Sequence, residues 1–391
     1  MSLIFEKRLN QHKQKGLYRE RKILQKLINV QRIYKSKIFC SFSSNDYLGL
    51  AQHPAVIKSF KEAVDHYGVG SGSSAFLGAY NRFHSELELG LAEFLDFPKV
   101  LIFSTGYMAN LGILGSLVKR KDALFVDRLS HASLIDGVRL SAAQFKRYRH
   151  NNPISLEKHL MQSTAQRKFI ITEGVFSMDG DIAPLPALAE VAQKFSSLLL
   201  IDDAHGIGIL GKTGKGICEH FACKPDILSG GFGKAFGCFG GFVAANESII
   251  ENLIQFARPY MYTTALPAAV AKAAHTSLVL LQTENWRREK LKSLIKHFRK
   301  IAKHLDLPLL LSNTPIQPIL MKNNEEAMAL SAYLLQNGIW VNAIRPPTVP
   351  ENTCRIRISL SALHSENEIN RLLEQIALGL KLIKINDDSI R

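Results

Sequence analysis

The sequence is poor in cysteine and in aromatic residues, and it lacks any long apolar run. Its five cysteines are an odd number scattered over 391 residues, which argues against a disulfide framework. With Phe, Trp and Tyr at only 8%, the chain lacks the aromatic platforms on which single-strand nucleic-acid binders stack bases. No run of ~18 uncharged apolar residues is present, so we expect no membrane-spanning helix.

Charged residues stand at the start of the chain, where a secretory signal would need an apolar stretch. Glu6, Lys7 and Arg8 are among them, and we therefore expect a soluble, cytoplasmic protein with no membrane contact. The apolar content of 46% suffices for a large core and excludes wholesale disorder.

The chain has fewer acidic than basic residues. Its 34 Asp and Glu against 49 Lys and Arg give a formal net charge of +15. This charge is compatible with nucleic acid, with anionic substrates or with an acidic protein partner. Because the basic residues are spread out, we expect no nucleic acid and interpret the charge as suited to an acidic donor. A basic nucleic-acid-binding protein is the alternative from a different class.

Short β-rich runs alternate with helical patterns in the first two thirds of the chain. The predicted strands are apolar on both faces, which favours an α/β fold with a largely parallel sheet covered by helices on both sides. They are 100–104, 123–127, 169–173, 198–202, 227–229 and 241–244. Helices are predicted to start near Tyr107, Ala132, Pro184 and Glu247.

The two ends of the chain differ from this pattern. Residues 1–40 are basic, and apolar residues from Leu17 to Ile28 have near-helical spacing. After Thr264 one long helix is predicted to run through Leu305, followed by strands at 317–321, 340–344 and 355–360 and helices at 325–337 and from Ser365. We therefore expect an N-terminal arm (1–45), a large domain (46–280) and a small α+β domain (281–391).

One segment, from Gly206 to Thr213, matches the phosphate-loop pattern G-x-x-x-x-G-K-[ST]. In a phosphate loop the Lys-Thr pair opens a helix whose amides face the phosphates. Here Gly214 and Gly216 follow at once, and glycine costs about 1 kcal/mol in a helix interior. We therefore expect no helix at Lys212 and no nucleotide triphosphatase.

Two other local patterns have ordinary explanations. The run 70–75 (GSGSSA) satisfies G-x-G-x-x-A, but residues 55–67 before it have helical periodicity, so the strand required for dinucleotide binding is missing. Cys218, His220 and Cys223 lie close in sequence without a second ligand cluster, and we expect no metal.

Polar residues follow five of the predicted strands at their carboxyl ends, where a doubly wound fold binds its ligand. Singly, each has an ordinary explanation as a turn former, a helix cap or a solvated charge. Together we expect them to meet at one edge of the sheet. In chain order they are Gly106 and Tyr107, His131, Glu173 to Ser177, Asp202 to His205, and Gly231 to Lys234.

Lys234 has the most informative surroundings. It lies between Gly233 and Ala235, so a flat ligand can approach its amine, as a Schiff-base lysine requires. Asp202 ends an apolar strand and is suited to pair with a protonated ring nitrogen, which keeps a pyridine ring able to accept electrons. The two residues together predict pyridoxal 5′-phosphate as the cofactor.

Several longer motifs occur in a fixed order along the chain. They are 43–50 (SSNDYLGL), 127–133 (DRLSHAS), 173–181 (EGVFSMDGD), 202–206 (DDAHG) and 232–237 (FGKAFG). Together they resemble the signatures of the pyridoxal-phosphate-dependent α-oxoamine synthases, and the likeness extends from Arg19 to the last helix. The segment 343–350 (AIRPPTVP), with 355–357 (RIR) after it, is similar to the members that use a pimeloyl thioester.

The resemblance implies a fold of the aspartate-aminotransferase type, fold type I, with a seven-stranded, mostly parallel sheet and a small C-terminal α+β domain. It implies a homodimer that condenses L-alanine with pimeloyl-CoA or pimeloyl-acyl carrier protein. The products are 8-amino-7-oxononanoate, carbon dioxide and the free thiol, in biotin biosynthesis. The alternative is a sister enzyme that uses glycine or serine with another acyl-CoA, such as a 2-amino-3-oxobutyrate ligase or an autoinducer synthase.

The same resemblance assigns roles at the cofactor. Lys234 would form the Schiff base and later remove the substrate α-proton, and Asp202 would bind the ring nitrogen. His131 would stack on the ring, contact the substrate and, as a second catalytic residue, help with later proton transfers. His205 and Ser177 would hold the side of the phenolic oxygen.

At the phosphate, the resemblance assigns backbone amides of Gly106 and Tyr107 at a helix N-terminus. The family usually has Thr or Ser three residues before the cofactor lysine, where this chain has Gly231. A hydrogen bond of about 1.5–3 kcal/mol is therefore missing or supplied otherwise. Our hypothesis is that Ser229, or Ser71 or Ser73 of the partner subunit, replaces it.

Four residues match substrate positions of the family. Arg357 would bind the alanine carboxylate, because a guanidinium group matches a carboxylate bidentately. Arg19, Asn45 and Thr348 match further positions that touch substrate in relatives.

Overall fold

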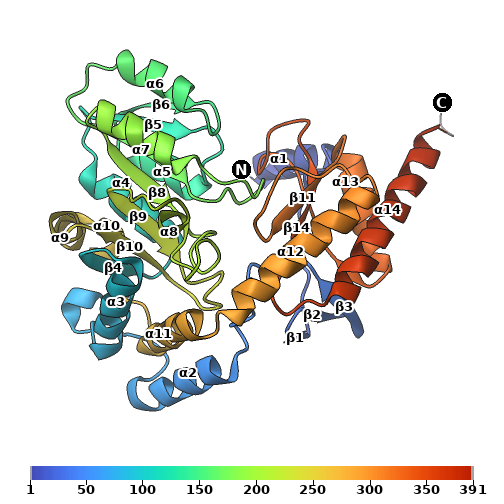
Figure 1. Ribbon diagram of the computed structural model, residues 1–391, viewed down its shortest axis with the longest axis horizontal. Coiled ribbons are helices and arrows are strands. Elements are labelled where there is room, and N and C mark those ends of the chain that lie inside the picture. Colours follow the sequence, from blue (N-terminus) through green and yellow to red (C-terminus); the bar gives the residue numbers. More distant parts are fainter. Residues whose placement is uncertain (1, 389–391) are drawn as a thin grey trace. The chain divides into compact units, whose positions relative to one another are not determined.

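The computed structural model describes residues 2–388, which divide into two compact units (Figure 1). The sheet unit comprises residues 48–177 and 181–288. The terminal unit comprises the residues up to 47, the short segment 178–180 and the residues from 289 onward. The N-terminal arm and the C-terminal region thus belong to the same unit.

The sheet unit is built on a seven-stranded sheet with the order β4-β10-β9-β8-β7-β5-β6. Only β10 is antiparallel to its neighbours; the other neighbouring pairs are parallel. The strands are β4 (Lys99–Phe103), β5 (Ala123–Asp127), β6 (Gln144–Tyr148), β7 (Lys168–Glu173), β8 (Leu198–Asp202), β9 (Ile227–Gly231) and β10 (Gly241–Ala245). This confirms the predicted α/β fold and six of its strands.

The seventh strand, β6, was not found from its own sequence. It is an edge strand in which four of five residues are exposed, so it lacks the continuous apolar run of the buried strands.

Helices follow most of the strands of the sheet unit. They are α2 (Pro54–Tyr67), the 3₁₀ turn η1 (Ala75–Leu77), α3 (Arg82–Leu95), α4 (Gly106–Leu117), α5 (Ala132–Leu140), α6 (Pro153–Met161), α7 (Leu185–Lys194), α8 (Ile217–Phe221), α9 (Glu247–Phe256), α10 (Arg258–Met261) and α11 (Ala268–Thr283). Side chains at the caps define several of the starts: Thr105, Asn152 and Asn246 each accept a bond from a first-turn amide.

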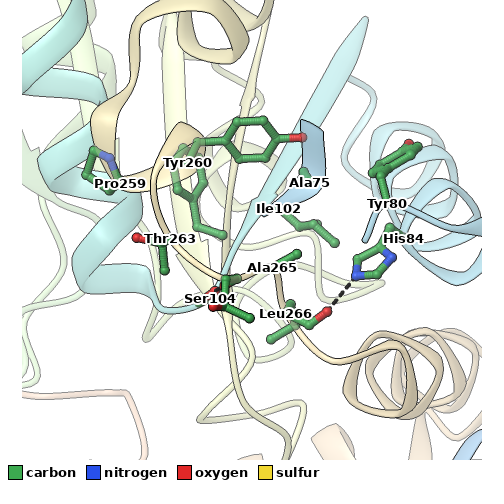
Figure 2. A pocket seen from close by; sticks show the side chains of 12 residues that line it. Ala75, Tyr80, His84, Ile102, Ser104, Pro259, Tyr260, Thr263, Ala265 and Leu266 are labelled. Carbon is green, nitrogen blue, oxygen red and sulfur yellow. Dashed lines mark hydrogen bonds between the residues drawn. The ribbon is translucent and has the colours of Figure 1, made fainter. Parts of the chain in front are cut away.

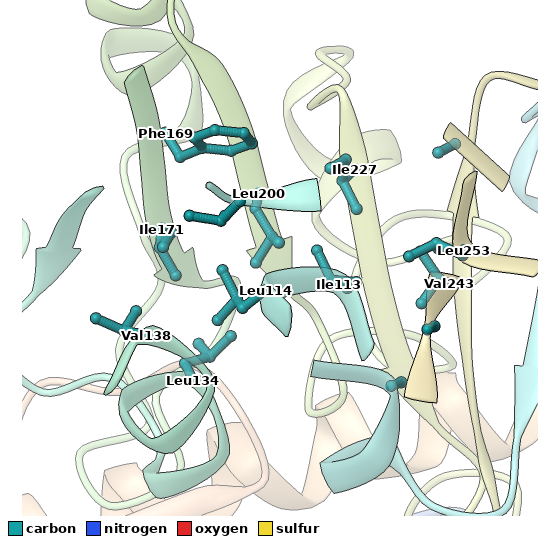
Figure 3. Close-up of a cluster of buried hydrophobic side chains, with 14 of the residues drawn as sticks. Ile113, Leu114, Leu134, Val138, Phe169, Ile171, Leu200, Ile227, Val243 and Leu253 are labelled. Carbon is teal, nitrogen blue, oxygen red and sulfur yellow. The ribbon is translucent and has the colours of Figure 1, made fainter. Parts of the chain in front are cut away.

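The main core lies on the sheet face covered by α4, α5 and α9 (Figure 3). Ile113 and Leu114 of α4 pack against Ile171, Leu200 and other alternate strand residues, all fully or almost fully buried. Successive side chains of a strand point to opposite faces of the sheet. The strand residues that alternate with those of this core therefore point to the other face of the sheet. The sheet therefore holds the ends of its strands in fixed register.

The terminal unit contains two smaller sheets. One has the order β1 (Lys26–Ile28), β2 (Gln31–Tyr34), β3 (Lys37–Ser41), β12 (Ile339–Trp340), and the other has the order β11 (Ile316–Leu320), β14 (Arg355–Ser359), β13 (Asn342–Ile344). Its helices are α1 (Ser2–Gln14), α13 (Asn324–Gln336), α14 (Glu366–Asp388) and most of α12 (Trp286–His304).

Three local predictions at the chain ends were wrong. The arm is helical only to Gln14, and the apolar residues from Leu17 lie in coil and in β1, because strand pairing with β2 outweighs their spacing. The predicted long helix breaks at Glu284 and Asn285, whose side chains accept bonds from Arg287 and Arg288. The strand expected at 340–344 is divided between β12 and β13, which pair in different sheets.

Candidate active site

The polar residues predicted at the strand ends lie together in the sheet unit. Strand register places Glu173 of β7 opposite Asp202 of β8, and Asp202 opposite Ser229 of β9. The ammonium group of Lys234, on the loop after β9, is close enough to act electrostatically on His131 and Glu173. The carboxyl ends of these parallel strands thus meet at one edge of the sheet, as predicted.

Asp202 is half-buried, and both oxygens of its carboxylate are held. The backbone N–H of Ala204 donates to Oδ1 at 3.0 Å, and the side-chain amide of Asn110 donates to Oδ2 at 2.7 Å. Each carboxylate oxygen has a second lone pair, so the group is oriented and still able to accept a bond from a ligand. Asn110 is not among the predicted site residues; its position as a lone Asn within the apolar sequence of α4 was the available signal.

His131 is the N-cap of α5, and its Nδ1 accepts the backbone N–H of Ser133 at 3.3 Å. Its ring meets the ring of Tyr107 edge to face, with centroids 6.3 Å apart. Desolvation lowers the pKa of His131; Asp202 opposes this effect and Lys234 adds to it. Burial therefore favours the neutral form of the imidazole.

Glu173 is a second acidic residue beside Lys234, with only 3% of its surface exposed. Its carboxylate accepts the backbone N–H groups of His131 and Ser177, which ties two candidate residues to the end of β7. Burial, followed by the charge of Asp202, raises the pKa of Glu173, whereas Lys234 lowers it. Its Oε1 atom is buried without a hydrogen-bond partner.

Asp203 and His205 follow Asp202 and are buried. Asp203 accepts the backbone N–H of Ile217 at 2.7 Å, and burial raises its pKa to about 8. A Cβ added at Gly174 or Gly206 would lie 2.1 Å from its Oδ1 atom. The glycines of the two motifs 173–181 and 202–206 therefore allow the strand ends to close around this carboxyl group.

The start of α4 provides a helix N-terminus next to two glycine-rich strands. Thr105 caps the helix by accepting the N–H of Met108 at 3.0 Å. A Cβ added at Gly241 would lie 2.4 Å from the backbone of Gly106, so only glycine lets β10 approach the helix start. Exposed N–H groups at such a terminus bind phosphate.

A lysine amine, a fixed carboxylate and these amides are the groups that pyridoxal phosphate needs for its aldehyde, ring nitrogen and phosphate. The residues fit the cofactor.

The serine hydroxyls proposed to replace the missing phosphate ligand have acceptors within this chain. Ser229 donates to Asn110 Oδ1 at 2.7 Å, and Ser71 donates to the carbonyl of Leu266 at 3.0 Å. The hydroxyl of Ser73 lies 3.1 Å from the carbonyl of Leu77. A hydroxyl has one proton, so Ser229 cannot bond to a phosphate without releasing Asn110.

The segment that matches the phosphate-loop pattern folds around a carboxylate of its own. The backbone N–H groups of Thr213, Gly214 and Lys215 all donate to Glu219, at 2.9–3.1 Å. No helix begins at Lys212; the next helix, α8, begins at Ile217. Glu219 thus holds the amide of the last residue of the pattern and the two amides after it, and no helix follows Lys212 directly.

His150 bridges two carboxylates beside the loop that carries Ser177. Its ring nitrogens lie 2.9 Å from Asp127 Oδ1 and 2.7 Å from Asp181 Oδ2, and its ring packs edge to face on Phe176. Desolvation disfavours its charge, but the hydrogen bonds to the two carboxylates outweigh this and raise the pKa of His150 to about 10. His150 therefore holds the end of β5 to the segment that follows Ser177. It is not among the residues predicted from the sequence.

This bridge predicts a pH-dependent stability. The pKa of His150 rises from 6.5 to about 10 on folding, so its contribution is complete below pH 6.5 and is lost as pH rises toward 10. We expect His150→Gln to lower the free energy of unfolding by about 2 kcal/mol near pH 6 and by much less near pH 9.5. Urea unfolding of both proteins at the two pH values checks this. An equal difference at both would contradict it.

In the terminal unit, the four predicted substrate residues form two hydrogen-bonded pairs. Arg357 of β14 is only 8% exposed, and both of its terminal nitrogens lie 3.2 Å from Asn45 Oδ1. Arg19 donates to the hydroxyl of Thr348 at 3.1 Å. Arg19 is thus the residue through which this part of the arm meets the 343–350 segment.

Arg345 was missed by sequence analysis, although it lies in the same segment. It is buried and donates to the backbone carbonyls of Gly16 and Tyr18. Arg345 therefore holds the arm so that Arg19 reaches Thr348.

A small pocket elsewhere in the sheet unit contains none of the candidate residues (Figure 2). Its only histidine, His84, accepts the N–H of Asn81 at Nδ1 and bonds the carbonyl of Leu266 through Nε2, 2.6 Å away. Both ring nitrogens are thus used to hold the backbone. Among residues 2–388, no three His, Cys, Asp or Glu side chains are grouped to hold a metal, and no helix is long and apolar enough to cross a membrane.

Comparison with known sequences places the chain in a family. Residues 37–376 match the model of the aminotransferase class I and II family. The chain is 51% identical over 371 residues to the 8-amino-7-oxononanoate synthase of Nitrosococcus oceani, covering 94% of this chain and 98% of that protein. It is 49% identical to the protein of that name from Saccharophagus degradans, covering 95% of each.

Solved structures of related enzymes also match this chain over most of its length. A serine palmitoyltransferase from S. paucimobilis with a bound PLP–myriocin aldimine matches with a TM-score of 0.92 at 31% identity, over 98% of both chains. The 8-amino-7-oxononanoate synthase of Francisella tularensis matches with a TM-score of 0.77 at 35% identity, over 88% of this chain and 99% of that one. The chain belongs to the aminotransferase class I and II family, and within it to the pyridoxal-phosphate-dependent acyltransferases named 8-amino-7-oxononanoate synthases.

Proposed function

We propose that this enzyme condenses L-alanine with a pimeloyl thioester, giving 8-amino-7-oxononanoate, carbon dioxide and the free thiol. The observation that carries the proposal is the identity of about half of all residues, over nearly the whole chain, to relatives named for this product. The reaction takes place in the cytoplasm: among residues 2–388 the five cysteines form no disulfide, in keeping with a reducing compartment.

Bound pyridoxal phosphate supplies an aldehyde for linkage to an amine and a cationic ring that accepts electrons from a neighbouring carbon. Lys234 would hold the cofactor through its amine and, once the amine of alanine has displaced it, would be free to take the proton from the alanine α-carbon. Asp202, fixed by Asn110 and Ala204, stabilises the protonated ring nitrogen. His131 would pack on the ring, and His205 and Ser177 would bind near its phenolic oxygen.

Gly106, Tyr107 and Gly231 line the phosphate end of the cofactor. The helix amides would supply the phosphate with donors, and Gly231 adds no side-chain donor. The Tyr107 hydroxyl bonds Asp136, which holds the ring that meets His131.

At the substrate, Arg357 binds the alanine carboxylate, and Asn45, Arg19 and Thr348 complete the contacts. Asn45 accepts two bonds from the guanidinium group of Arg357, which fixes its plane for bidentate binding. The donor is pimeloyl-CoA or pimeloyl-acyl carrier protein, both acidic, and the net charge of +15 favours their encounter.

A substrate panel tests the proposal. Purified enzyme is assayed with alanine, glycine and serine against pimeloyl, acetyl and palmitoyl thioesters, and kcat/KM is compared. We expect alanine with a pimeloyl donor to lead by at least about tenfold, since a pocket built for one acyl chain discriminates by about 1–3 kcal/mol. Preference for glycine with acetyl-CoA, or for serine with palmitoyl-CoA, would instead identify a sister enzyme.

The enzyme works as a homodimer. The segment 69–77 supports this, because it exposes three large apolar side chains, Val69, Phe76 and Leu77, at 84%, 53% and 77%. Contiguous exposed apolar groups mark contact surfaces. Sedimentation of the wild type and of Leu77→Glu shows whether this surface joins two copies.

A serine at position 231 should tighten cofactor binding. A Cβ added at Gly231 meets only ordinary contacts, at 3.7 Å from Gly240 O and 3.9 Å from Ala204 Cβ, so Gly231→Ser has room. Its hydroxyl supplies one neutral-to-charged hydrogen bond, and we expect the Kd of the cofactor to fall about tenfold. Gly231→Ala is the matched control without a hydroxyl. Equal Kd values for the two variants would show that the phosphate lies out of reach of this position.

A further inference from the structure

A buried asparagine connects two residues of the cofactor site. Asn110 of α4 is only 1% exposed. Its Nδ2 atom lies 2.7 Å from Asp202 Oδ2 and 2.9 Å from Ser133 Oγ, and its Oδ1 atom lies 2.7 Å from Ser229 Oγ. The amide therefore uses both of its N–H groups and its carbonyl oxygen within the protein.

The charge of Asp202 sets the direction of every bond in this group. An ionised carboxylate only accepts, so the NH₂ end of Asn110 faces Asp202 and its oxygen faces Ser229, whose hydroxyl donates. The second N–H of Asn110 donates to Ser133 Oγ. The hydroxyl proton of Ser133 is then available for another acceptor.

That acceptor is His131. Ser133 Oγ lies 2.8 Å from His131 Nδ1, and the backbone N–H of Ser133 donates to the same nitrogen at 3.3 Å. Because two donors converge on Nδ1, this atom carries no proton. In a neutral imidazole the proton is then on Nε2.

We propose that Asn110 is a positioning residue that fixes the carboxylate of Asp202 and, through Ser133, holds His131 as the neutral Nε2–H tautomer. The proposal rests on the proposed function, in which Asp202 and His131 contact the cofactor ring. A proton added at Nδ1 would meet both donors of Ser133, so the network also opposes the charged form. The tautomer leaves Nε2 as the one ring atom that can donate.

Nitrogen NMR of the full-length protein labelled with ¹⁵N-histidine tests the proposal, with and without added pyridoxal phosphate. The His131 signals are assigned by their loss in His131→Gln. We expect Nδ1 to show the shift of an unprotonated nitrogen and Nε2 that of a protonated one. In Ser133→Ala one hydrogen bond to Nδ1 is lost, so we expect the tautomer ratio to move about fivefold toward Nδ1–H and the titration of His131 to move to higher pH.

A second variant tests the link to Asp202. Asn110→Ala removes the amide donor, and we expect the Kd of the cofactor to rise about tenfold, since hydrogen bonds to charged groups are the stronger ones. Ser116→Ala is the matched control: this hydroxyl lies on the same helix but bonds Gly112 O, and neither signal nor Kd should change.

Two results would overturn the proposal: a protonated Nδ1 in the wild type, or a tautomer ratio that Ser133→Ala leaves unchanged. The Ser133→Ala spectra can be recorded even if Asn110→Ala does not fold. The spectra of the cofactor-free chain do not depend on the reaction catalysed. A failed proposal on Asn110 is therefore distinct from a failed proposed function, which the substrate panel reports.

Discussion

Replacing Lys234 by alanine is expected to abolish covalent cofactor attachment and to lower kcat by at least about 10³-fold. General-base catalysis alone contributes about 10²–10⁴-fold, and this amine is also the proposed point of attachment. Its electrostatic effects on His131, Glu173 and Asp203 place it at the centre of the polar group of the sheet unit.

Borohydride reduction followed by peptide mass mapping measures the attachment directly. In the wild type the label should lie on the peptide that contains residue 234, and in Lys234→Ala no lysine should carry it. Lys212→Ala is the matched control, because Lys212 is an exposed lysine of the glycine-rich segment closed by Glu219; it should keep full labelling and rate. A label on another lysine of the wild type would refute the assignment of the site.

Partial rescue separates the chemical role of Lys234 from a structural one. A small primary amine such as methylamine, added to Lys234→Ala, should restore part of the rate if the missing group is a base at the substrate. A variant that has merely lost its fold would not respond. Far-UV circular dichroism of the variant provides the parallel check on folding.

The sequence was sufficient for the parts of the molecule in which local pattern and tertiary structure agree. Strands β5 and β8 begin and end where predicted, because continuous apolar runs in a parallel sheet are buried on both faces. Once these strands are placed, the convergence of His131, Asp202 and Lys234 follows from parallel topology.

The residues that support the site could not be found in this way. Asn110 and His150 act through partners far apart in the sequence. The apolar residues around Asn110 indicate that it is buried, but they do not identify Asp202 as the residue that it bonds. Glu219 illustrates the converse case. The glycine-rich pattern 206–213 is present, but the amides at its end and just after it bind a carboxylate of the same chain.

The arm shows a third limit. Its apolar residues have helical spacing, yet β1, β2 and β3 form there because their backbones pair with one another and with β12. Pairing of β3 with β12 joins residues about 300 positions apart, which no local window of sequence contains.

Substituting Arg357 by lysine is expected to raise the KM for L-alanine about 10- to 100-fold, with a smaller effect on kcat. Lysine keeps the charge but loses the planar fork, so one of two charge-assisted bonds to a carboxylate is lost, at about 1.5–3 kcal/mol. The surrounding contacts hold the guanidinium group of Arg357 in place: Ser359 Oγ lies 2.7 Å from one of its terminal nitrogens, and Asn45 Oδ1 accepts bonds from both.

Arg355→Lys is the control for this substitution. Arg355 lies two residues earlier on β14 and bonds Asp179 and the carbonyl of Thr353. Its substitution should therefore lower the stability of the protein without a specific increase in the KM for alanine. Steady-state kinetics with varied alanine and with varied pimeloyl donor distinguish the two variants. If Arg357→Lys raised the KM for the acyl donor as much as that for alanine, Arg357 would not be the residue that binds the amino-acid carboxylate, and its contacts with Asn45 and Ser359 would serve the fold of the terminal unit alone.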